Sequence, residues 1–522
     1  MALIDKETRY DRQLRLWASS GQANLEASHI CLINATTTGL EALKNLVLPG
    51  AGDYTIIDES VITEQNLAGS FFLDQDDIGE KIAVVASSRL NELNSDVRGH
   101  YDDRSVHDIL TQETPDFWNK FSVVVISDYF PFLDELVNLL WEKGIPLVVV
   151  NCLGFYGSLQ LIMNETTVIE THDPSKVYDL RIDEPWLELK QFTDSFELDD
   201  LDDTDHAHVP YVLILIKALQ RWKDSHHGQS PQNYLEKKQF RKDVEGMSRR
   251  IGIEANFLEA TNSIHKALQT TRIPQSIMEI FNQASTNHEK VTKSTLMFWL
   301  LVVALKRFVQ KNDFQLPLPG TLPDMASDTL NYIQLQNIYK NKAIRDETLF
   351  KQELTNVLKE ADRSIEDISG EVIKSFCRNS QFLYVTNGSK EPYSQNLMFQ
   401  LFNEPSEGDD ERSSTLAIYF TILNYNKYID TFKTCPEIED LDRFIELFLQ
   451  SFAPHLKEVP ESLLLTFKEA LTHSIHNYHN INSFMGGVAS QEVLKLATGQ
   501  YIPVDNLFVF DGIRSVSDKW KI

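Results

Sequence analysis

Cysteine is scarce in this chain. Only four of the 522 residues are cysteines, namely Cys31, Cys152, Cys377 and Cys435. No two of them form a C-x-x-C pair and none shows the spacing of zinc ligands, so the sequence predicts no metal site. Cys31 and Cys152 lie in or at the end of apolar runs, which is typical of buried thiols. We expect reduced thiols in an intracellular protein.

Positive charge is also in deficit. The chain has 49 Lys and Arg residues against 76 Asp and Glu residues, which gives a formal net charge of −27. Such a surface repels the phosphate backbones of DNA and RNA, so we expect no nucleic-acid partner. The acidic excess is interpreted as a solvated surface, with the steering of a basic partner as the alternative.

Long hydrophobic runs are missing as well. No apolar run reaches the roughly 18 residues of a membrane-spanning helix. The first ten residues, MALIDKETRY, contain no apolar signal-peptide core. Apolar residues nevertheless make up 42% of the chain, which is typical of a packed globular protein. We expect no membrane contact and a cytoplasmic and nuclear location.

A nucleotide-binding loop lacks two of its glycines. Residues 30–58 have the outline of a dinucleotide-binding βαβ unit that ends in Asp58, an acid about 20 residues past the turn. The turn, from Asn34 to Gly39, reads NATTTG in place of G-x-G-x-x-G. The two missing glycines let a backbone approach phosphate, whereas the third packs the helix on the strand. The frame of a nucleotide site is therefore kept and its phosphate cradle is lost.

The periodicity of apolar residues divides the chain into three parts. Residues 1–170 alternate strands and helices, which predicts an α/β fold with a doubly wound, mostly parallel sheet. Residues 171–477 are mainly helical and are predicted to be a large insertion. Residues 478–522 return to the α/β domain. The expected strands span 29–34, 54–58, 122–126, 147–151 and 506–512, and the expected helices of the α/β domain include 40–48, 81–93 and 484–500.

Two features of the last helix are predicted from its glycines. We expect Gly486 and Gly487 to open the helix and to allow close backbone contact; a phosphate-binding nest is the alternative. Gly499 is expected to end it.

Four segments resemble the ubiquitin-like-protein activating enzymes, and among them the non-catalytic, regulatory subunits of the neddylation-activating (Nedd/Rub-activating) enzyme. The resemblance covers nearly the whole chain. In that superfamily two related adenylation modules pair, and one often degenerates into a scaffold. The segments are RYDRQLRLW at 9–17, GLEALKNLVLPGAGDYTIID at 39–58, GTLPDMASDTLNYIQLQNIYKNKA at 320–343 and MGGVASQEVLKLATGQ at 485–500.

The resemblance also implies that this adenylation module is degenerate. The family's active module reads G-x-G-x-x-G, D-x-D, N-L-x-R-Q and V-G-x-x-K-A. Here Asn34 and Thr36 stand at the first two glycines, Ser60 at the second acid, Gly69 at the arginine and Ile82 at the lysine. These changes remove the groups that hold a triphosphate and its metal ion. We expect no cofactor on this chain.

The resemblance places the chemistry on a partner chain. Neither Cys377 nor Cys435 has the family's active-cysteine setting, so no thioester is expected here. The catalytic activating-enzyme subunit is expected to hold ATP, Mg²⁺, zinc and the reactive cysteine, and the heterodimer to act on the Nedd/Rub ubiquitin-like protein.

Arg12 is the residue expected to contribute to that chemistry. In the family, the arginine of this N-terminal motif reaches across the dimer and touches the ATP phosphates, as an arginine finger does. Arg15, one turn further on, is the next candidate. The alternative is an arginine on the helix surface that pairs with Asp11 or Glu7.

The stretch from Asp205 to His208 reads DHAH and superficially suggests zinc. A full set of four ligands is not evident, so we interpret it as an N-terminal cap and hydrogen-bonding element.

The predicted function is that of a regulatory subunit that scaffolds the heterodimer and contributes Arg12 to adenylation of the modifier's C-terminus, before thioester transfer. One alternative is an interaction scaffold with a dead nucleotide fold. Another is the related SUMO-activating subunit, against which the length of the helical region argues. A dehydrogenase is disfavoured because the loop lacks two of three glycines.

Overall fold

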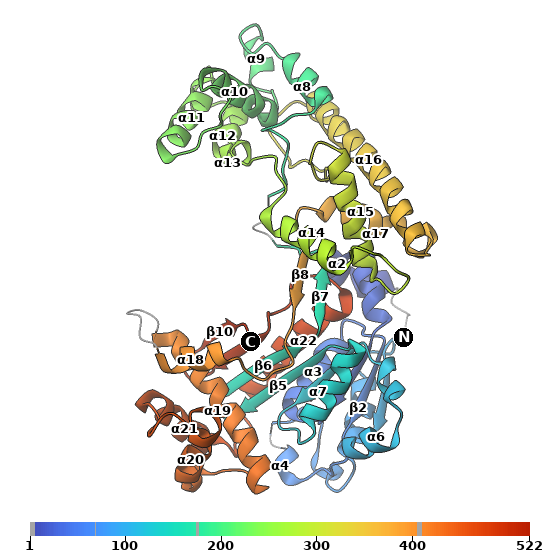
Figure 1. Ribbon diagram of the computed structural model, residues 1–522, viewed down its shortest axis with the longest axis vertical. Helices are drawn as coiled ribbons and strands as arrows, with labels where there is room; N and C mark the ends of the chain where they lie inside the picture. The colour runs from blue at the N-terminus through green and yellow to red at the C-terminus, as the bar shows by residue number, and fades with distance from the viewer. Residues whose placement is uncertain (1–5, 68, 174–176, 404–409) are drawn as a thin grey trace. The chain divides into compact units, whose positions relative to one another are not determined.

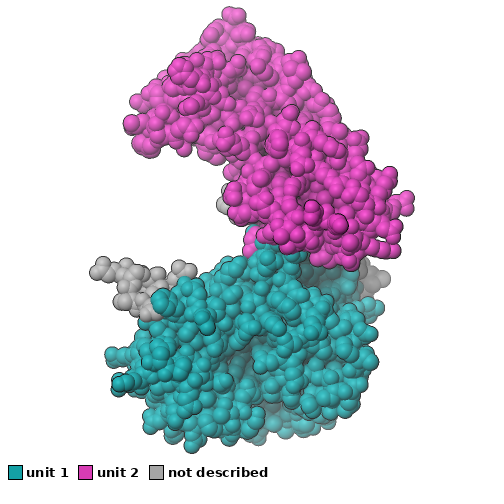
Figure 2. Space-filling view, viewed as in Figure 1, with its two compact units in different colours: residues 1–168, 385–522 teal, residues 169–384 magenta. Residues whose placement is uncertain are grey.

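The computed structural model describes residues 6–67, 69–173, 177–403 and 410–522. The chain forms two compact units, which Figure 2 colours separately. Unit 1 contains residues 1–168 and 385–522, and unit 2 contains residues 169–384.

Unit 1 is built on an eight-stranded sheet with the order β3-β2-β1-β4-β5-β6-β9-β10 (Figure 1). The strands from β3 to β5 run parallel, whereas β6, β9 and β10 are added antiparallel. The α/β fold with a mostly parallel sheet is therefore confirmed. The strand bounds are β1 His29–Ile33, β2 Asp53–Ile57, β3 Arg98–Asp102, β4 Val123–Ser127, β5 Leu147–Leu153, β6 Tyr156–Ile162, β9 Leu507–Asp511 and β10 Val516–Trp520.

Helices cover both faces of the sheet because alternate strand residues point to opposite sides. Ile30 and Leu32 of β1 join one apolar cluster, and Cys31 and Ile33 join another. The first cluster includes residues of α3 (Thr37–Val47), α5 (Ile82–Asn91) and α22 (His479–Thr498). The second includes residues of α6 (Val106–Gln112) and α7 (Leu133–Lys143).

Helix α22 packs along α3, and its course corrects one prediction. It begins at His479, seven residues before Gly486, so the paired glycines lie inside the helix and do not open it. A Cβ atom at Gly486 would lie 2.8 Å from Glu41 Cβ and 2.9 Å from the Thr38 carbonyl oxygen. Gly486 therefore permits the close backbone contact expected of it, whereas the same expectation is wrong for Gly487, where a Cβ would meet nothing within 4 Å. Gly499 ends the helix in the left-handed conformation, with φ 68°, as predicted.

The predicted insertion over 171–477 extends further than unit 2 of the structure, which ends at residue 384. The helices after that residue bury their apolar faces against the antiparallel end of the sheet. Their side chains share one cluster with Tyr156 of β6 and with Leu507 and Val509 of β9. The helices are α18 (Gln395–Asn403), α19 (Asp410–Phe432), α20 (Leu441–Phe452) and α21 (Glu461–His473).

Unit 2 is mainly helical. Helix α10 buries nine of its 15 side chains, and these lie at the centre of one apolar cluster. Strands β7 (Glu165–Val168) and β8 (Tyr384–Asn387) pair where the chain leaves and re-enters unit 1. The helices are α8 (Leu187–Asp194), α9 (Asp203–His206), α10 (Tyr211–Ser225), α11 (Tyr234–Gly246), α12 (Ala255–Asn262), α13 (Ile264–Ala267), α14 (Gln275–Asn287), α15 (Met297–Lys311), α16 (Thr329–Glu360) and α17 (Gly370–Asn379).

Within the described ranges, no helix combines the length and the apolar character needed to cross a membrane.

Candidate functional site

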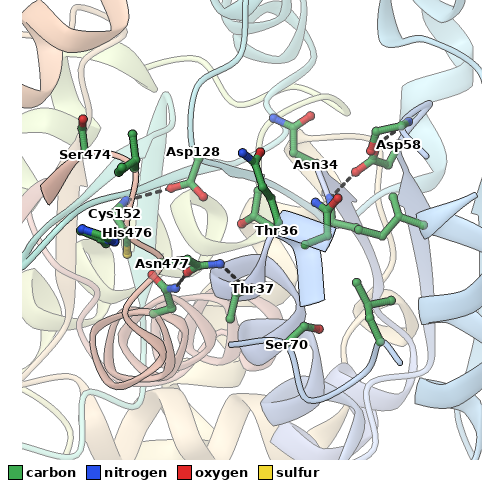
Figure 3. A pocket seen from close by; sticks show the side chains of 18 of the residues that line it. Asn34, Thr36, Thr37, Asp58, Ser70, Asp128, Cys152, Ser474, His476 and Asn477 are labelled. Carbon is green, nitrogen blue, oxygen red and sulfur yellow. Dashed lines mark hydrogen bonds between the residues drawn. The ribbon is translucent and has the colours of Figure 1, made fainter. Parts of the chain in front are cut away.

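A cavity of about 490 Å³ opens at the carboxyl ends of β1, β2, β4 and β5 (Figure 3). Its lining includes five of the motif positions singled out from the sequence: Asn34, Thr36, Asp58, Ser60 and Ile82. Open α/β sheets bind ligands at this edge, so the cavity is the counterpart of the predicted nucleotide site.

The loop that should cradle phosphate is closed by its own side chains. Asn34 adopts φ 63°, a conformation that glycine adopts readily, and its Nδ2 donates to the carbonyl oxygens of Ser127 (3.2 Å) and Tyr129 (3.0 Å). Thr36 caps α3, where its Oγ1 accepts the Gly39 N–H at 3.5 Å. A Cβ at Gly39 would lie 2.8 Å from Leu32 Cδ1, which confirms the packing role of the surviving glycine.

Asp58 at the end of β2 is engaged by the chain itself. One carboxylate oxygen accepts the backbone N–H of Ala35 at 2.7 Å, and the other accepts the backbone N–H of Ser60 at 2.8 Å and the Ser60 hydroxyl. Ser60, at the position of the family's second acid, is therefore a donor to Asp58 and supplies no carboxylate. A ligand hydroxyl would share this carboxylate with three existing donors.

Gly69 and Ile82 stand where the family's active module has an arginine and a lysine, and neither side chain carries a charge. Gly69 has φ 84°, and a Cβ there would lie 3.3 Å from the carbonyl oxygen of Asn477, just before α22. Ile82 is 2% exposed and packs in the core beneath the cavity. The neighbouring Lys81 precedes α5, and its ammonium donates to the backbone carbonyl of Glu59.

The remaining charge of the cavity is negative. Its described lining contains the carboxylates of Asp58, Glu59 and Asp128 and no lysine or arginine. Burial raises the pKa of Asp128 to about 6, although hydrogen bonds from the Cys152 backbone N–H (2.8 Å) and from Thr36 lower it. At neutral pH these three charges repel a triphosphate.

Sequence reasoning missed part of this lining. Asp128 follows β4 directly, and an acid at the carboxyl end of a parallel strand was a readable signal. His476 and Asn477 belong to the loop between α21 and α22, about 440 residues along the chain from the β1–α3 turn, and no local pattern predicts their position. Asn477 Nδ2 donates to Thr37 Oγ1 at 2.9 Å (Figure 3).

Arg12 lies away from this cavity. It is an exposed residue in the first turn of α2 (Asp11–Glu26) and forms no hydrogen bond or ion pair with any described residue. Asp11 pairs instead with Arg15, at 2.9 Å. The preceding Tyr10 contacts Asn94, shortly before β3, so the start of α2 lies at the amino edge of the sheet, opposite the cavity.

Three of the four cysteines have surroundings that disfavour reactivity. Burial raises the pKa of the thiols of Cys31, Cys152 and Cys377, which disfavours the nucleophilic thiolate. Cys435 is exposed.

The His-rich stretch is a structural element. His206 is buried, with Nδ1 2.8 Å from Glu254 Oε1 and its ring stacked on Phe257. Asp202, and not Asp205, caps α9. His208 Nδ1 lies 2.6 Å from the Thr204 carbonyl oxygen. Among the residues that the structure describes, no group of His, Cys, Asp and Glu side chains has the arrangement of a metal site.

The sequence of this chain is similar to those of known proteins. Residues 10–521 match the ThiF family. The chain is 35% identical to the NEDD8-activating enzyme E1 regulatory subunit of Gallus gallus, over 99% of this chain and 98% of the relative. It is 33% identical to the subunit of that name in Danio rerio, over 99% of both chains. For the Drosophila melanogaster subunit the identity is 32%, over 100% and 98%.

Proposed function

Because this chain belongs to the ThiF family, and within it to the NEDD8-activating enzyme E1 regulatory subunits, we propose that it is the regulatory half of a heterodimeric activating enzyme. The observation that carries the proposal is the similarity to those subunits over the full length of both chains. A catalytic subunit would be its partner, and the Nedd/Rub ubiquitin-like protein would be the substrate of the pair.

The charges in this chain support the proposed division of roles between the two subunits. ATP held with Mg²⁺ on the partner would supply the adenylyl group, which is transferred to the modifier's C-terminal carboxylate with release of pyrophosphate. This chain's own cavity has three carboxylates and no cation in its described lining, so it is poorly suited to a second triphosphate. The thiols of Cys31, Cys152 and Cys377, whose pKa values are raised by burial, are poorly suited to a thioester, which we assign to the partner.

Arg12 is the group that we assign to the reaction. Its guanidinium is exposed and has no partner among the described residues, so it is available to an anion on another chain. It lies at the sheet edge opposite this chain's cavity, so any contact with a nucleotide would be made in trans. A guanidinium fork that meets the phosphate oxygens stabilises charge that develops in the transition state.

The test is ATP–pyrophosphate exchange in the presence of the ubiquitin-like modifier. We expect the purified chain to be inactive alone and the reconstituted pair to be active, with the two subunits eluting together on gel filtration. Exchange by the chain alone at the rate of the pair would contradict the proposal, as would a partner that reaches the same rate without this chain.

A pure scaffold is the second candidate, and the degenerate cavity favours it equally. The two candidates predict different results for one experiment. If the chain is only a scaffold, substitution of Arg12 should leave ATP–pyrophosphate exchange by the pair unchanged.

A further inference from the structure

The start of α2 is anchored by a buried tyrosine. Tyr10 is 2% exposed, although Arg9 and Asp11 on either side of it are exposed. Its hydroxyl donates to Asp96 Oδ2 at 3.2 Å and accepts from Asn94 Nδ2 at 3.0 Å. A single side chain therefore connects the first turn of α2 to the segment before β3.

The site that receives Tyr10 is itself built into the domain. A Cβ atom at Gly50, which has φ 92°, would lie 2.9 Å from the Tyr10 hydroxyl oxygen, so only glycine leaves room for it. Asn94 is 1% exposed and also donates to the Val47 carbonyl oxygen at 2.8 Å, at the end of α3. Arg9 adds an ion pair to Asp96 at 3.1 Å.

The same segment is fixed again about two turns later. The helix breaks at Trp17 and Ala18, whose φ values are −128° and 55°. The Trp17 carbonyl oxygen accepts from Gln500 Nε2 at 3.0 Å, and the Leu16 carbonyl oxygen accepts from the Tyr501 hydroxyl at 3.0 Å. Residues 11–16 thus form a short helical segment that is held at both ends, with Arg12 and Arg15 exposed between.

A helical segment of six residues is not stable by itself, because nucleation orders several residues for each hydrogen bond gained. An arginine on a frayed segment would have to be ordered each time it bound, and that entropy would weaken the contact. Held at Tyr10 and Trp17, the backbone of Arg12 is ordered before any ligand arrives.

We propose that Tyr10 is a positioning residue for Arg12: its hydroxyl, bound to Asn94 and Asp96, fixes the turn from which Arg12 contacts an anion on the partner module. This inference rests on the proposed function, and within it explains how an exposed arginine at a helix start is preorganised.

The experiment is a double-mutant cycle in the reconstituted heterodimer, read as KM for ATP and kcat of ATP–pyrophosphate exchange. Tyr10→Phe keeps the ring and removes the hydroxyl. We expect it to lower kcat/KM about 3- to 10-fold, as the loss of one or two hydrogen bonds would. In the Arg12→Ala background the same change should lower kcat/KM less than about twofold, because the guanidinium that Tyr10 positions is already absent.

Tyr54→Phe is the matched control. The Tyr54 hydroxyl is also buried and has two hydrogen-bond acceptors, the Ser87 carbonyl oxygen (3.0 Å) and Asn91 Oδ1 (3.1 Å), but neither belongs to α2. It should lower the melting temperature without changing kcat/KM. Hydrogen–deuterium exchange of the amides of residues 11–16 should rise in Tyr10→Phe and stay unchanged in Tyr54→Phe.

The outcomes separate the two proposals. If Arg12→Ala exchanges like the wild type, the role of Arg12 in trans is wrong and the positioning role is wrong with it. If Arg12→Ala is impaired but Tyr10→Phe is not, only the positioning role is wrong. Equal losses from Tyr10→Phe in both backgrounds would show that Tyr10 acts on stability and not through Arg12.

Discussion

The backbone N–H of Ala35 donates a hydrogen bond of 2.7 Å to the carboxylate of Asp58, and this bond joins the loop after β1 to the end of β2. Both partners belong to the nucleotide-site frame that the sequence retains. In this structure they bind each other, so the frame is stabilised by its own chain and needs no nucleotide to order it.

The first prediction is that the isolated chain binds Mg·ATP weakly or not at all. The three carboxylates of the cavity repel the triphosphate, and the Asn34 and Thr36 side chains occupy the cradle. Isothermal titration calorimetry of the purified chain should show no micromolar binding. A dissociation constant in the micromolar range would mean that the cavity is a working nucleotide site.

Substitution of Arg12 should impair adenylation without dissociating the heterodimer. We expect Arg12→Ala to lower kcat/KM for exchange on the order of 30- to 1,000-fold, or about 2–4 kcal/mol for one preorganised donor. Arg12→Lys should recover only part, because an ammonium does not reproduce the guanidinium fork. Arg443→Ala, which removes an exposed arginine of α20, is the control. A wild-type rate for Arg12→Ala at low ATP would contradict the role of Arg12 in trans and support the scaffold candidate instead.

No cysteine of this chain should accept the modifier. Replacement of all four by Ser or Ala should leave thioester formation by the heterodimer intact, provided that the chain folds. Since Cys31 and Cys377 are buried, Ala is the safer choice at those two positions. A thioester band that migrates with the wild-type chain on a non-reducing gel would refute this expectation.

The adjacent glycines of α22 should respond in opposite ways to alanine. Gly486→Ala places a Cβ 2.8 Å from Glu41 Cβ and should destabilise the chain by about 1–3 kcal/mol, through overpacking against α3. At Gly487 a Cβ would meet nothing within 4 Å. Gly487→Ala should therefore stabilise by up to about 1 kcal/mol, through helix propensity. Denaturant titration of both variants measures the two effects, and a loss of the same size in both would contradict the packing argument.

Asp128 should give stability a measurable pH dependence. Its pKa is raised from 3.8 to about 6 in the folded chain, so the folded state binds more protons than the unfolded state between these values. Stability contributed by this group therefore falls as pH rises from about 4 to 6 and stays low above. Asp128→Asn keeps an oxygen for the Cys152 N–H and should be more stable than the wild type at pH 7.5, by about 1–2 kcal/mol. The difference should vanish below about pH 4 in thermal melts; a difference that is independent of pH would exclude titration of Asp128 as its source.

The centre of the sheet was predictable because the parallel strands β1, β2, β4 and β5 are apolar runs covered on both faces. Strands β1, β2, β4, β5 and β9 all lie where the sequence placed them. Strand β3 was missed because it lies at the edge and reads RGHYD, without an apolar run. Strand β6 was missed because Gly157, Ser158 and Gln160 interrupt its apolar pattern, although every residue in it is buried.

Long-range packing accounts for the other differences. Nothing in the local pattern of α18 to α21 distinguishes a helix on the sheet from a helix of unit 2. The predicted insertion over 171–477 therefore included residues 385–477, which belong to unit 1. The degenerate positions of the cavity were readable from the motif spacing, but Asp128 and Asn477 reach it from other elements. Arg12 was singled out by resemblance, and the structure adds the anchoring of its helix by Tyr10.

The contact beside Gly69 makes the loss at that position hard to reverse. An arginine there would have to adopt φ 84° and place its Cβ 3.3 Å from the Asn477 carbonyl oxygen and 3.5 Å from His479 Cβ. Restoring the lost cation by a single substitution therefore introduces strain, which would be relieved only by a second change some 400 residues along the chain. The loop that contains Gly69 and the segment before α22 therefore constrain each other, so that the sequence of either one cannot change at this contact independently of the other.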